Sequence, residues 1–200
     1  MKKLTLVCLL LIGSIAMSLA QTAKQVLDKC AATVSAASGV SAQFTMNSAQ
    51  YGNASGTIAI KGQKFCMKSS RTSMWFDGTT LWTYVASNEE VNISKPTAQQ
   101  LQTLNPYNFI NLYKKGFSQT MTTSASDFNV HLTATDQQHK IREAFLTIDK
   151  KTYAPKEIKM LTGSKWTTFT ISGLKTEKQA DATFRFDSSA YPDAEIIDLR

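Results

Sequence analysis

The sequence predicts one α+β domain built on an antiparallel sheet, and three observations support this class. Apolar residues recur at helical spacing over 22–37 and alternate with polar residues from Val40. Helical spacing returns over 97–115, and alternation resumes after Phe117. Asp77-Gly78 joins two strongly apolar strands, and such a pair is a strong hairpin signal because glycine adopts positive φ at little cost. Helix, sheet, helical insert and sheet therefore follow one another along the chain.

The first twenty residues have the features of a secretory signal. Met1-Lys2-Lys3 is basic, an apolar run follows, and small residues lead up to Ala20. The run is too short to span a bilayer stably, so we expect cleavage after Ala20 and one exported domain over 21–200. The formal net charge of +7 then falls to +5, because Lys2 and Lys3 leave the 22 basic residues and the 15 acidic ones remain. The basic residues form no run interleaved with aromatics, so we expect no nucleic acid partner.

The first half of the predicted sheet follows the amphipathic helix 22–37, which Ser38-Gly39 terminates. Residues 40–47 alternate between apolar and polar, as in a half-buried strand. A turn is predicted at 51–56. The strands after it carry large apolar side chains, among them Ile58, Ile60, Phe65, Met67, Trp75, Leu81, Trp82 and Tyr84.

The second half begins with the helical insert. Thr97 and Gln100 fit a capping box, and Asn105-Pro106 starts a second short helix that Gly116 ends. Strands are predicted around 128–134, 144–149, 158–160 and 166–174, with a short late strand at Phe184 and Phe186 and an extended tail over 191–200. Every predicted strand contributes large apolar residues, so the sheet needs a cover on each apolar face.

Motifs for catalysis are absent from the sequence. It contains no G-x-S-x-G, H-E-x-x-H, P-loop, C-x-x-C or Gly-rich dinucleotide turn. His131 and His139 have no evident partner for catalysis or metal binding, so we expect structural or surface histidines and no metal site. Cys30 and Cys66 remain after export, and they are either a disulfide or, as we favour, two buried thiols.

An excess of large apolar residues between Phe44 and Tyr84 is the unusual feature. One helix rich in Ala, Val and Leu cannot cover both faces of these strands, and the insert at 97–115 would close over what remains. Aromatic and methionine side chains suit a pocket for variable apolar ligands. A closed core of the same composition is an equal alternative at this point.

Five short motifs occur in a specific order along nearly the whole exported chain. After the opening helix come the strand 40–44 and G-x-I-x-I-K at 56–61. D-G-x-x-L-W-x-Y follows at 77–84, Asn-Pro lies inside the helical insert, and A-x-F-x-F occupies 182–186. In this order the motifs resemble the periplasmic outer-membrane lipoprotein carrier proteins, the LolA-like family.

The resemblance implies an incomplete antiparallel β-barrel, a curved sheet whose concave face is covered by helices around a hydrophobic cavity for acyl chains. We expect the cavity to be lined by Phe44, Met46, Ile58, Ile60, Phe65 and Met67, and by Trp82 and Tyr84 if their strand turns them inward. The lid would present Leu101, Leu104, Phe109, Ile110 and Leu112. Lys61 matches the family's latch arginine, although lysine lacks the planar guanidinium fork.

The resemblance also implies a function. We expect a monomeric periplasmic carrier that takes acylated lipoproteins from an inner-membrane lipoprotein-releasing transporter to an outer-membrane acceptor, without a cofactor. A periplasmic regulator of the same fold that senses lipid or lipoprotein is the alternative. An enzyme acting on lipid or envelope polymer is a third candidate, but the sequence shows no nucleophile–base pair.

Overall fold

The computed structural model describes residues 21–50, 52–97, 100–101 and 113–200. One α-helix, α1 (Ala23–Val34), precedes the described strands. The strands are β1 (Val40–Ser48), β2 (Gly52–Lys61), β3 (Lys64–Ser69), β4 (Thr72–Phe76), β5 (Leu81–Val85), β6 (Glu90–Ser94), β7 (Phe117–Thr123), β8 (Asp127–Ala134), β9 (Ile141–Asp149), β10 (Pro155–Thr162), β11 (Lys165–Thr176) and β12 (Glu195–Asp198). Two short 3-10 turns, η2 (Asp181–Phe184) and η3 (Ser188–Ala190), lie between β11 and β12.

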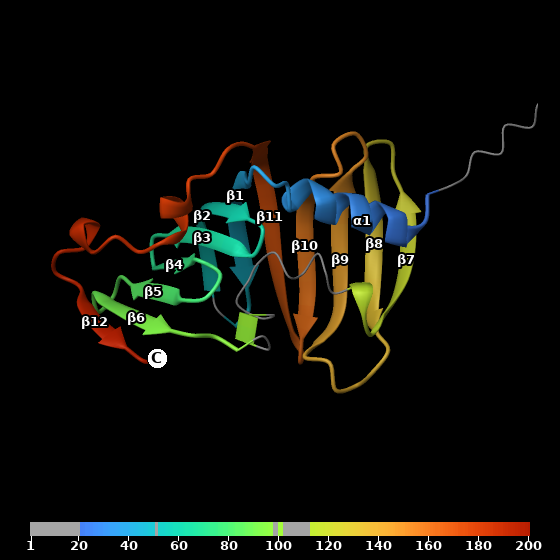
Figure 1. Cartoon of the computed structure of the whole chain (residues 1–200). Helices are drawn as coiled ribbons and strands as arrows, with labels where there is room; N and C mark the ends of the chain where they lie inside the picture. The colour runs from blue at the N-terminus through green and yellow to red at the C-terminus, as the bar shows by residue number, and fades with distance from the viewer. Residues whose placement is uncertain (1–20, 51, 98–99, 102–112) are drawn as a thin grey trace, which may run out of the picture.

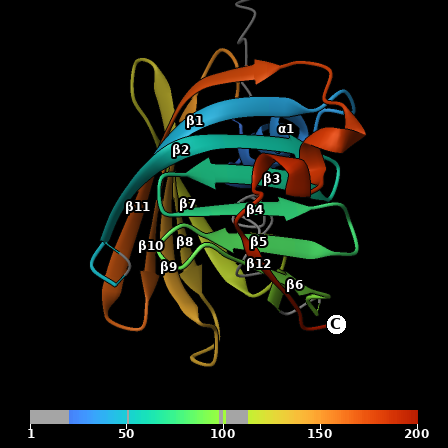
Figure 2. The same ribbon diagram turned by 90° about the vertical axis from the view of Figure 1, so that its left-hand side faces the viewer.

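All these strands belong to one sheet, in the order β12-β6-β5-β4-β3-β2-β1-β11-β10-β9-β8-β7. Neighbours are antiparallel except β12, which runs parallel to β6. The sheet therefore consists of two meanders, β1–β6 and β7–β11, that meet where β1 pairs with β11. We call this junction the seam. The sheet curves strongly around the side on which α1 lies and does not close (Figure 2).

The helix α1 begins at a complete capping box. The Thr22 hydroxyl accepts a hydrogen bond from the Gln25 amide at 3.2 Å, and the Gln25 side chain accepts one from the Thr22 amide at 3.0 Å. The apolar face of α1 packs over the β7–β10 half of the sheet (Figure 1). It forms the largest buried cluster there, with Val26, Leu27, Cys30, Ala31 and Val34 against Val130, Leu132, Leu146, Ile148 and Ile158. We call the face of the sheet that α1 covers the inner face.

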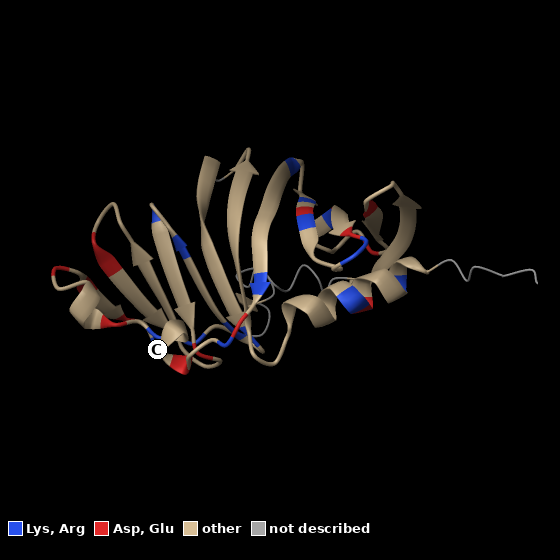
Figure 3. Cartoon of the chain, turned by 90° about the horizontal axis from the view of Figure 1, so that it is seen from above, with Lys and Arg blue, Asp and Glu red and all other residues tan. Residues whose placement is uncertain are grey.

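Charged side chains lie mainly at strand ends, in connections and on α1 (Figure 3). The middles of the strands are therefore largely uncharged, and on strands such as β1 apolar side chains alternate with polar ones, as the sequence pattern predicts. On the β1–β6 half, a second cluster of Val40, Ile60, Phe65, Phe76 and Leu81 occupies the inner face. A third cluster of Cys66, Trp75 and Phe184 occupies the outer face, where the C-terminal segment 177–194 covers it.

Most predicted elements are confirmed, and three are corrected. The predicted turn at 51–56 is wrong, because β2 already begins at Gly52 and pairs with β1 through Gly52↔Ser48. The predicted late strand is also wrong, since Phe184 ends the 3-10 turn η2 and neither it nor Phe186 belongs to a strand. The first helix is shorter than 22–37, with Ser35 as its C-cap. The capping box at Thr97 and Gln100 is present, at 2.8 and 3.2 Å.

The fold class is borne out as a curved, open, largely antiparallel sheet. Cover of the concave face by several helices is not shown, because α1 is the one α-helix with defined bounds in the described residues and most of the helical insert lies outside them.

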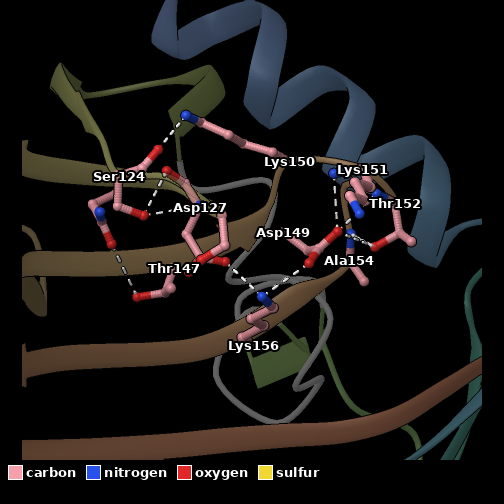
Figure 4. A network of polar contacts seen from close by, with 11 residues as sticks. Ser124, Asp127, Thr147, Asp149, Lys150, Lys151, Thr152, Ala154 and Lys156 are labelled. Carbon is pink, nitrogen blue, oxygen red and sulfur yellow. Dashed lines mark hydrogen bonds and ion pairs between the residues drawn. The ribbon is translucent and has the colours of Figure 1, made fainter.

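A network of polar contacts ties the connections at one end of β8, β9 and β10 together (Figure 4). The Lys156 ammonium lies 2.6 Å from an Asp127 oxygen and 2.9 Å from an Asp149 oxygen. Asp149 also accepts hydrogen bonds from the Lys151 and Thr152 amides, at 2.9 Å each. These contacts hold the pKa of the Asp149 carboxyl well below the usual range for aspartate and lower the pKa of the Asp127 carboxyl, with Lys156 as the largest cause in both.

Replacing Lys156 with methionine is expected to destabilise the protein at neutral pH more than in acid. A carboxyl whose pKa is lowered by folding contributes stability above its unfolded pKa of about 4, and that contribution disappears as the pH falls through the native pKa. Urea unfolding of wild type and Lys156→Met at about pH 7 and about pH 2.5 tests this. The difference should be clear at the higher pH and shrink at the lower. Lys165→Met, which removes a lysine at the start of β11, is the control and should show no such pH dependence.

Candidate functional site

An apolar pocket lies on the inner face at the seam between the two meanders. Its volume is about 60 Å³. Thirteen described residues line it, and of these only Ser41 is polar, with its hydroxyl hydrogen-bonded to the Glu177 carboxylate. The lining residues are Val34, Val40, Ser41, Ala42, Phe44, Ile58, Ile60, Met67, Pro155, Ile158, Phe169, Ile171 and Leu174. The described walls thus carry no charge, and they suit an apolar ligand.

A bulge at the seam places one wall of this pocket. Ser41 pairs with Lys175 but Gln43 pairs with Ser172, so β11 has one extra residue opposite Ala42. Gly173, with φ of +61°, accommodates the extra residue. Ile171 and Leu174 are an odd number of residues apart and would point to opposite faces of a regular strand. Because of the bulge, both side chains line the same pocket.

Four predicted cavity residues come together in this pocket, namely Phe44, Ile58, Ile60 and Met67. They do so because alternation along β1, β2 and β3 turns these positions to one face, with Ile58 opposite Met67. Met46 shares that face further along β1, opposite Phe169, but does not line the pocket. Phe65 is fully buried in the neighbouring inner cluster, with its ring centroid 5.5 Å from that of Phe76.

Trp82 and Tyr84 lie on the other side of the sheet. Leu81 belongs to the inner cluster, so alternation along β5 sends Trp82 and Tyr84 to the outer face. There they pack with Trp75, Phe186 and Tyr191, with ring centroids 4.6 Å apart for Tyr84–Tyr191 and 5.4 Å for Trp75–Phe186. The aromatic residues of the D-G-x-x-L-W-x-Y and A-x-F-x-F motifs therefore meet in one cluster outside the pocket. Their shared role is to pack the C-terminal segment against the sheet.

Lys61 has its described partners in the C-terminal segment. Its ammonium donates to the Gln179 carbonyl at 3.0 Å and pairs with Asp181 at 3.1 Å, a carboxylate that Lys64 shares at the same distance. Lys61 follows Ile60, an inner-face residue, so alternation turns it away from the pocket. The predicted latch to the lid stays a prediction, because most of the lid lies outside the described residues; the described contacts join Lys61 to residues 179–181.

The predicted lid falls mostly outside the described residues. Leu104, Phe109, Ile110 and Leu112 are not described. Leu101 is described, and it packs against the inner cluster of Val40, Ile60, Phe65, Phe76 and Leu81. The start of the insert therefore rests on the inner face beside the pocket.

Sequence reasoning missed the pocket wall contributed by α1, β10 and β11, namely Val34, Pro155, Ile158, Phe169, Ile171 and Leu174. Their alternation was visible, with Ile158 and Phe169 in predicted strands. The missing information was the β1–β11 pairing, which joins segments far apart in the sequence.

The cysteines and histidines serve the packing of the described chain. Cys30 and Cys66 are free, buried thiols on opposite faces of the sheet, and burial raises the pKa of Cys30 to about 12.

His131 stacks on Phe145, with ring centroids 4.1 Å apart, and its Nε2 lies 3.1 Å from a carboxylate oxygen of Glu143, so this histidine does have a carboxylate partner. No group of three or more potential metal ligands occurs among the described residues. None of the described helices combines the length and hydrophobicity needed to cross a membrane.

Comparisons with known proteins give a family and a fold. Residues 14–164 match the family described as "Outer membrane lipoprotein carrier protein LolA". No curated protein matches the sequence. The structure is similar to an uncharacterized conserved protein from Thermus thermophilus, with a TM-score of 0.60, 12% identity, and coverage of 89% of this chain and 99% of that one.

Two further solved structures are similar over most of this chain. MucB gives a TM-score of 0.50 and 14% identity, with 83% of this chain and 63% of MucB covered, so the chain spans less than two thirds of MucB. A LolA superfamily protein from Nitrosomonas europaea gives a TM-score of 0.44 and 12% identity, over 84% of this chain and 99% of that one. At these identities the likenesses to the Thermus protein and MucB concern the fold alone.

Proposed function

Because the chain belongs to the outer membrane lipoprotein carrier protein family, LolA, we propose that it is a periplasmic carrier that holds lipoprotein acyl chains in the inner-face pocket. It takes acylated lipoproteins from an inner-membrane transporter to an outer-membrane acceptor, with export by the segment 1–20. The chemistry is binding rather than catalysis, and the lining of the pocket is apolar apart from Ser41. The observation that carries the proposal is the uncharged, almost wholly apolar lining of the pocket at the seam.

The energetics of the cargo fit such a lining. Each exposed CH₂ of an acyl chain costs about 0.8 kcal/mol in water, so a multiply acylated protein needs a shield to cross an aqueous space. The walls contributed by Phe44, Ile58, Met67, Phe169 and Ile171 offer only aliphatic and aromatic surface. Met67 adds adaptability, because an unbranched thioether side chain takes many shapes.

The pocket must widen before cargo fits. Sites for drug-sized ligands measure roughly 300–1,000 Å³, several times the volume of about 60 Å³ found here. We propose that the insert over 97–115, of which Leu101 packs on the inner face, moves aside as the lid and that the walls at the seam separate as acyl chains enter.

Replacing Met67 with glutamate is expected to abolish acyl binding while the protein stays folded. Met67 is half-buried and lines the pocket, so the carboxylate reaches water in the empty protein but would be desolvated by cargo. Titration with a fluorescent fatty acid should show at least a tenfold loss of affinity. Phe145→Glu is the matched control, because it adds the same charge to a large apolar residue on the outer face that is 39% exposed. Equal binding by wild type and Met67→Glu would place the acyl site elsewhere.

The carrier and the sensing regulator differ in turnover. A carrier accepts a triacylated lipoprotein from donor membranes and passes it to acceptor membranes, whereas a regulator binds lipid without net transfer. A transfer assay with a labelled lipoprotein therefore decides between them. Transfer by wild type that is lost in Met67→Glu supports the carrier, and binding without transfer favours the regulator.

A further inference from the structure

A second cavity lies on the outer face, between β3–β4 and the C-terminal segment. Its volume is about 330 Å³, within the range of small-molecule sites. The sheet supplies Lys68 and Trp75 to its lining, and the C-terminal segment supplies Thr183, Arg185, Asp187 and Tyr191. The sheet itself separates this cavity from the inner-face pocket. The lining of the cavity contains aromatic and charged side chains, whereas that of the pocket contains no charged ones.

Lys68 is the first reason to expect an anion here. Its described interactions include a contact with the Trp75 ring, with Nζ 5.8 Å from the centroid, but no carboxylate pairs with it within the described part of the chain. By contrast, Lys61 and Lys64, which flank the turn between β2 and β3, both pair with the Asp181 carboxylate. A lysine that lines a cavity without a carboxylate partner is available to a ligand.

Arg185 is the second reason, because it approaches the same cavity from the opposite wall. Its Nε lies 3.6 Å from an Asp77 oxygen, and its terminal nitrogens make no hydrogen bond to the residues that the structure describes. Asp187 is the acidic member of the lining, but its carboxylate is engaged within its own turn. Its Oδ1 accepts hydrogen bonds from the Ser189 amide at 3.0 Å and from the Ser189 hydroxyl at 2.7 Å. These bonds keep the pKa of Asp187 low, so the lining has a net charge of +1 from two cations and one anion.

We propose that this cavity binds a phosphodiester group. A phosphodiester carries one negative charge, which suits a lining of two cations and one anion, and its two non-bridging oxygens diverge. They can accept from Lys68 on the sheet and from Arg185 on the C-terminal segment, while the Thr183 hydroxyl donates to a third oxygen. A carboxylate has two coplanar oxygens and suits a single bidentate arginine better. Trp75 and Tyr191 then pack against the organic groups that the phosphate esterifies.

Phospholipid headgroups and soluble glycerophosphodiesters share this chemistry. A headgroup would seat the outer face on a membrane surface, while a soluble ester would be a free ligand of the protein. The site is independent of acyl binding on the inner face, so its failure would leave the proposed carrier function intact.

Calorimetric titration with soluble glycerophosphoglycerol tests the proposal. Wild type should bind it, and Lys68→Gln and Arg185→Gln should each lower the affinity at least tenfold. Lys159→Gln is the matched control, because Lys159 is also an outer-face lysine over a tryptophan, 4.7 Å from the Trp166 centroid, but does not line the cavity. It should bind like wild type. Absence of binding, or equal losses in all three variants, would overturn the proposal.

Two further arms identify the ligand. Glycerate, a carboxylate without an acyl chain for the inner-face pocket, should bind at least tenfold more weakly than glycerophosphoglycerol, and equal or tighter binding would overturn the phosphodiester assignment. Co-flotation with phosphatidylglycerol vesicles that is lost in Lys68→Gln and Arg185→Gln, but kept in Lys159→Gln and in Met67→Glu, identifies the lipid headgroup. Calorimetric binding without co-flotation supports the site and identifies a soluble ester as its ligand.

Discussion

Replacing Gly56 with alanine is expected to destabilise the protein by roughly 3 kcal/mol, or to prevent its folding. Gly56 lies in β2, and a Cβ atom there would stand 1.9 Å from the Lys68 carbonyl oxygen and 3.1 Å from Cε1 of the Phe44 ring. The backbone of β3 therefore has to move away from β2, and the ring that lines the pocket has to turn. Gly56 is the first residue of the G-x-I-x-I-K motif, and this close approach is its physical explanation.

Thermal unfolding measures this effect. A loss of that size corresponds to a fall in Tm of about 10 °C for a chain of this length. Gly163→Ala is the matched control, because a Cβ there meets nothing within 4 Å and the substitution tests only the positive φ of +61°. That variant should lose about 1 kcal/mol. Similar losses in the two variants would mean that β2 and β3 separate easily at Gly56.

Replacing Phe65 with glutamate is expected to unfold the protein, although Met67→Glu two residues away leaves it folded. Phe65 has no exposed surface and packs on Phe76, so a carboxylate there is an unpaired buried charge that costs roughly 3–5 kcal/mol. Met67 faces the pocket instead. The two positions share one strand and one face, and they differ in whether a pocket or a closed core lies above them.

Circular dichroism and solubility distinguish the two variants directly. A folded, soluble Phe65→Glu would show that the space above Phe76 and Leu81 opens to solvent, and the pocket would then extend across β3 to β5. Phe65→Leu is a useful companion, because it keeps an apolar side chain and should lose only about 1 kcal/mol.

The strands were predictable because each one carries its own alternation. Val40, Ala42, Phe44 and Met46 show a period of two that local residues alone determine, and β1 forms where this period predicts it. The capping boxes at Thr22 and Thr97 are local in the same sense, and both are present. Phe184 and Phe186 mimic a strand by spacing, but their burial comes from the tryptophan and tyrosine rings of β4 and β5 rather than from strand pairing.

The site was predictable only in part, because it depends on contacts between distant segments. Alternation assigned Phe44, Ile58, Ile60 and Met67 to one face, and these residues do line one pocket. For Trp82 and Tyr84 the pattern could not say which face is inward, since Leu81 and Trp82 are both large and apolar. The opposite wall, from Ile158 to Leu174, belongs to the pocket through the β1–β11 pairing and the bulge at Gly173. Neither the β1–β11 pairing nor the bulge has a local sequence signal as strong as that of a tight turn.

The seam has a consequence for the order of folding. Each meander joins strands that are adjacent in sequence, whereas the Ser48–Thr167 contact at the seam spans 119 residues. Closing so long a loop costs chain entropy, so we expect the seam to form after the hairpins on either side of it. The inner-face pocket takes its walls from both meanders and is therefore completed in that late step. A ligand that touches both walls acts on interactions that are absent from earlier states of the chain, and it will slow unfolding while leaving the folding rate nearly unchanged.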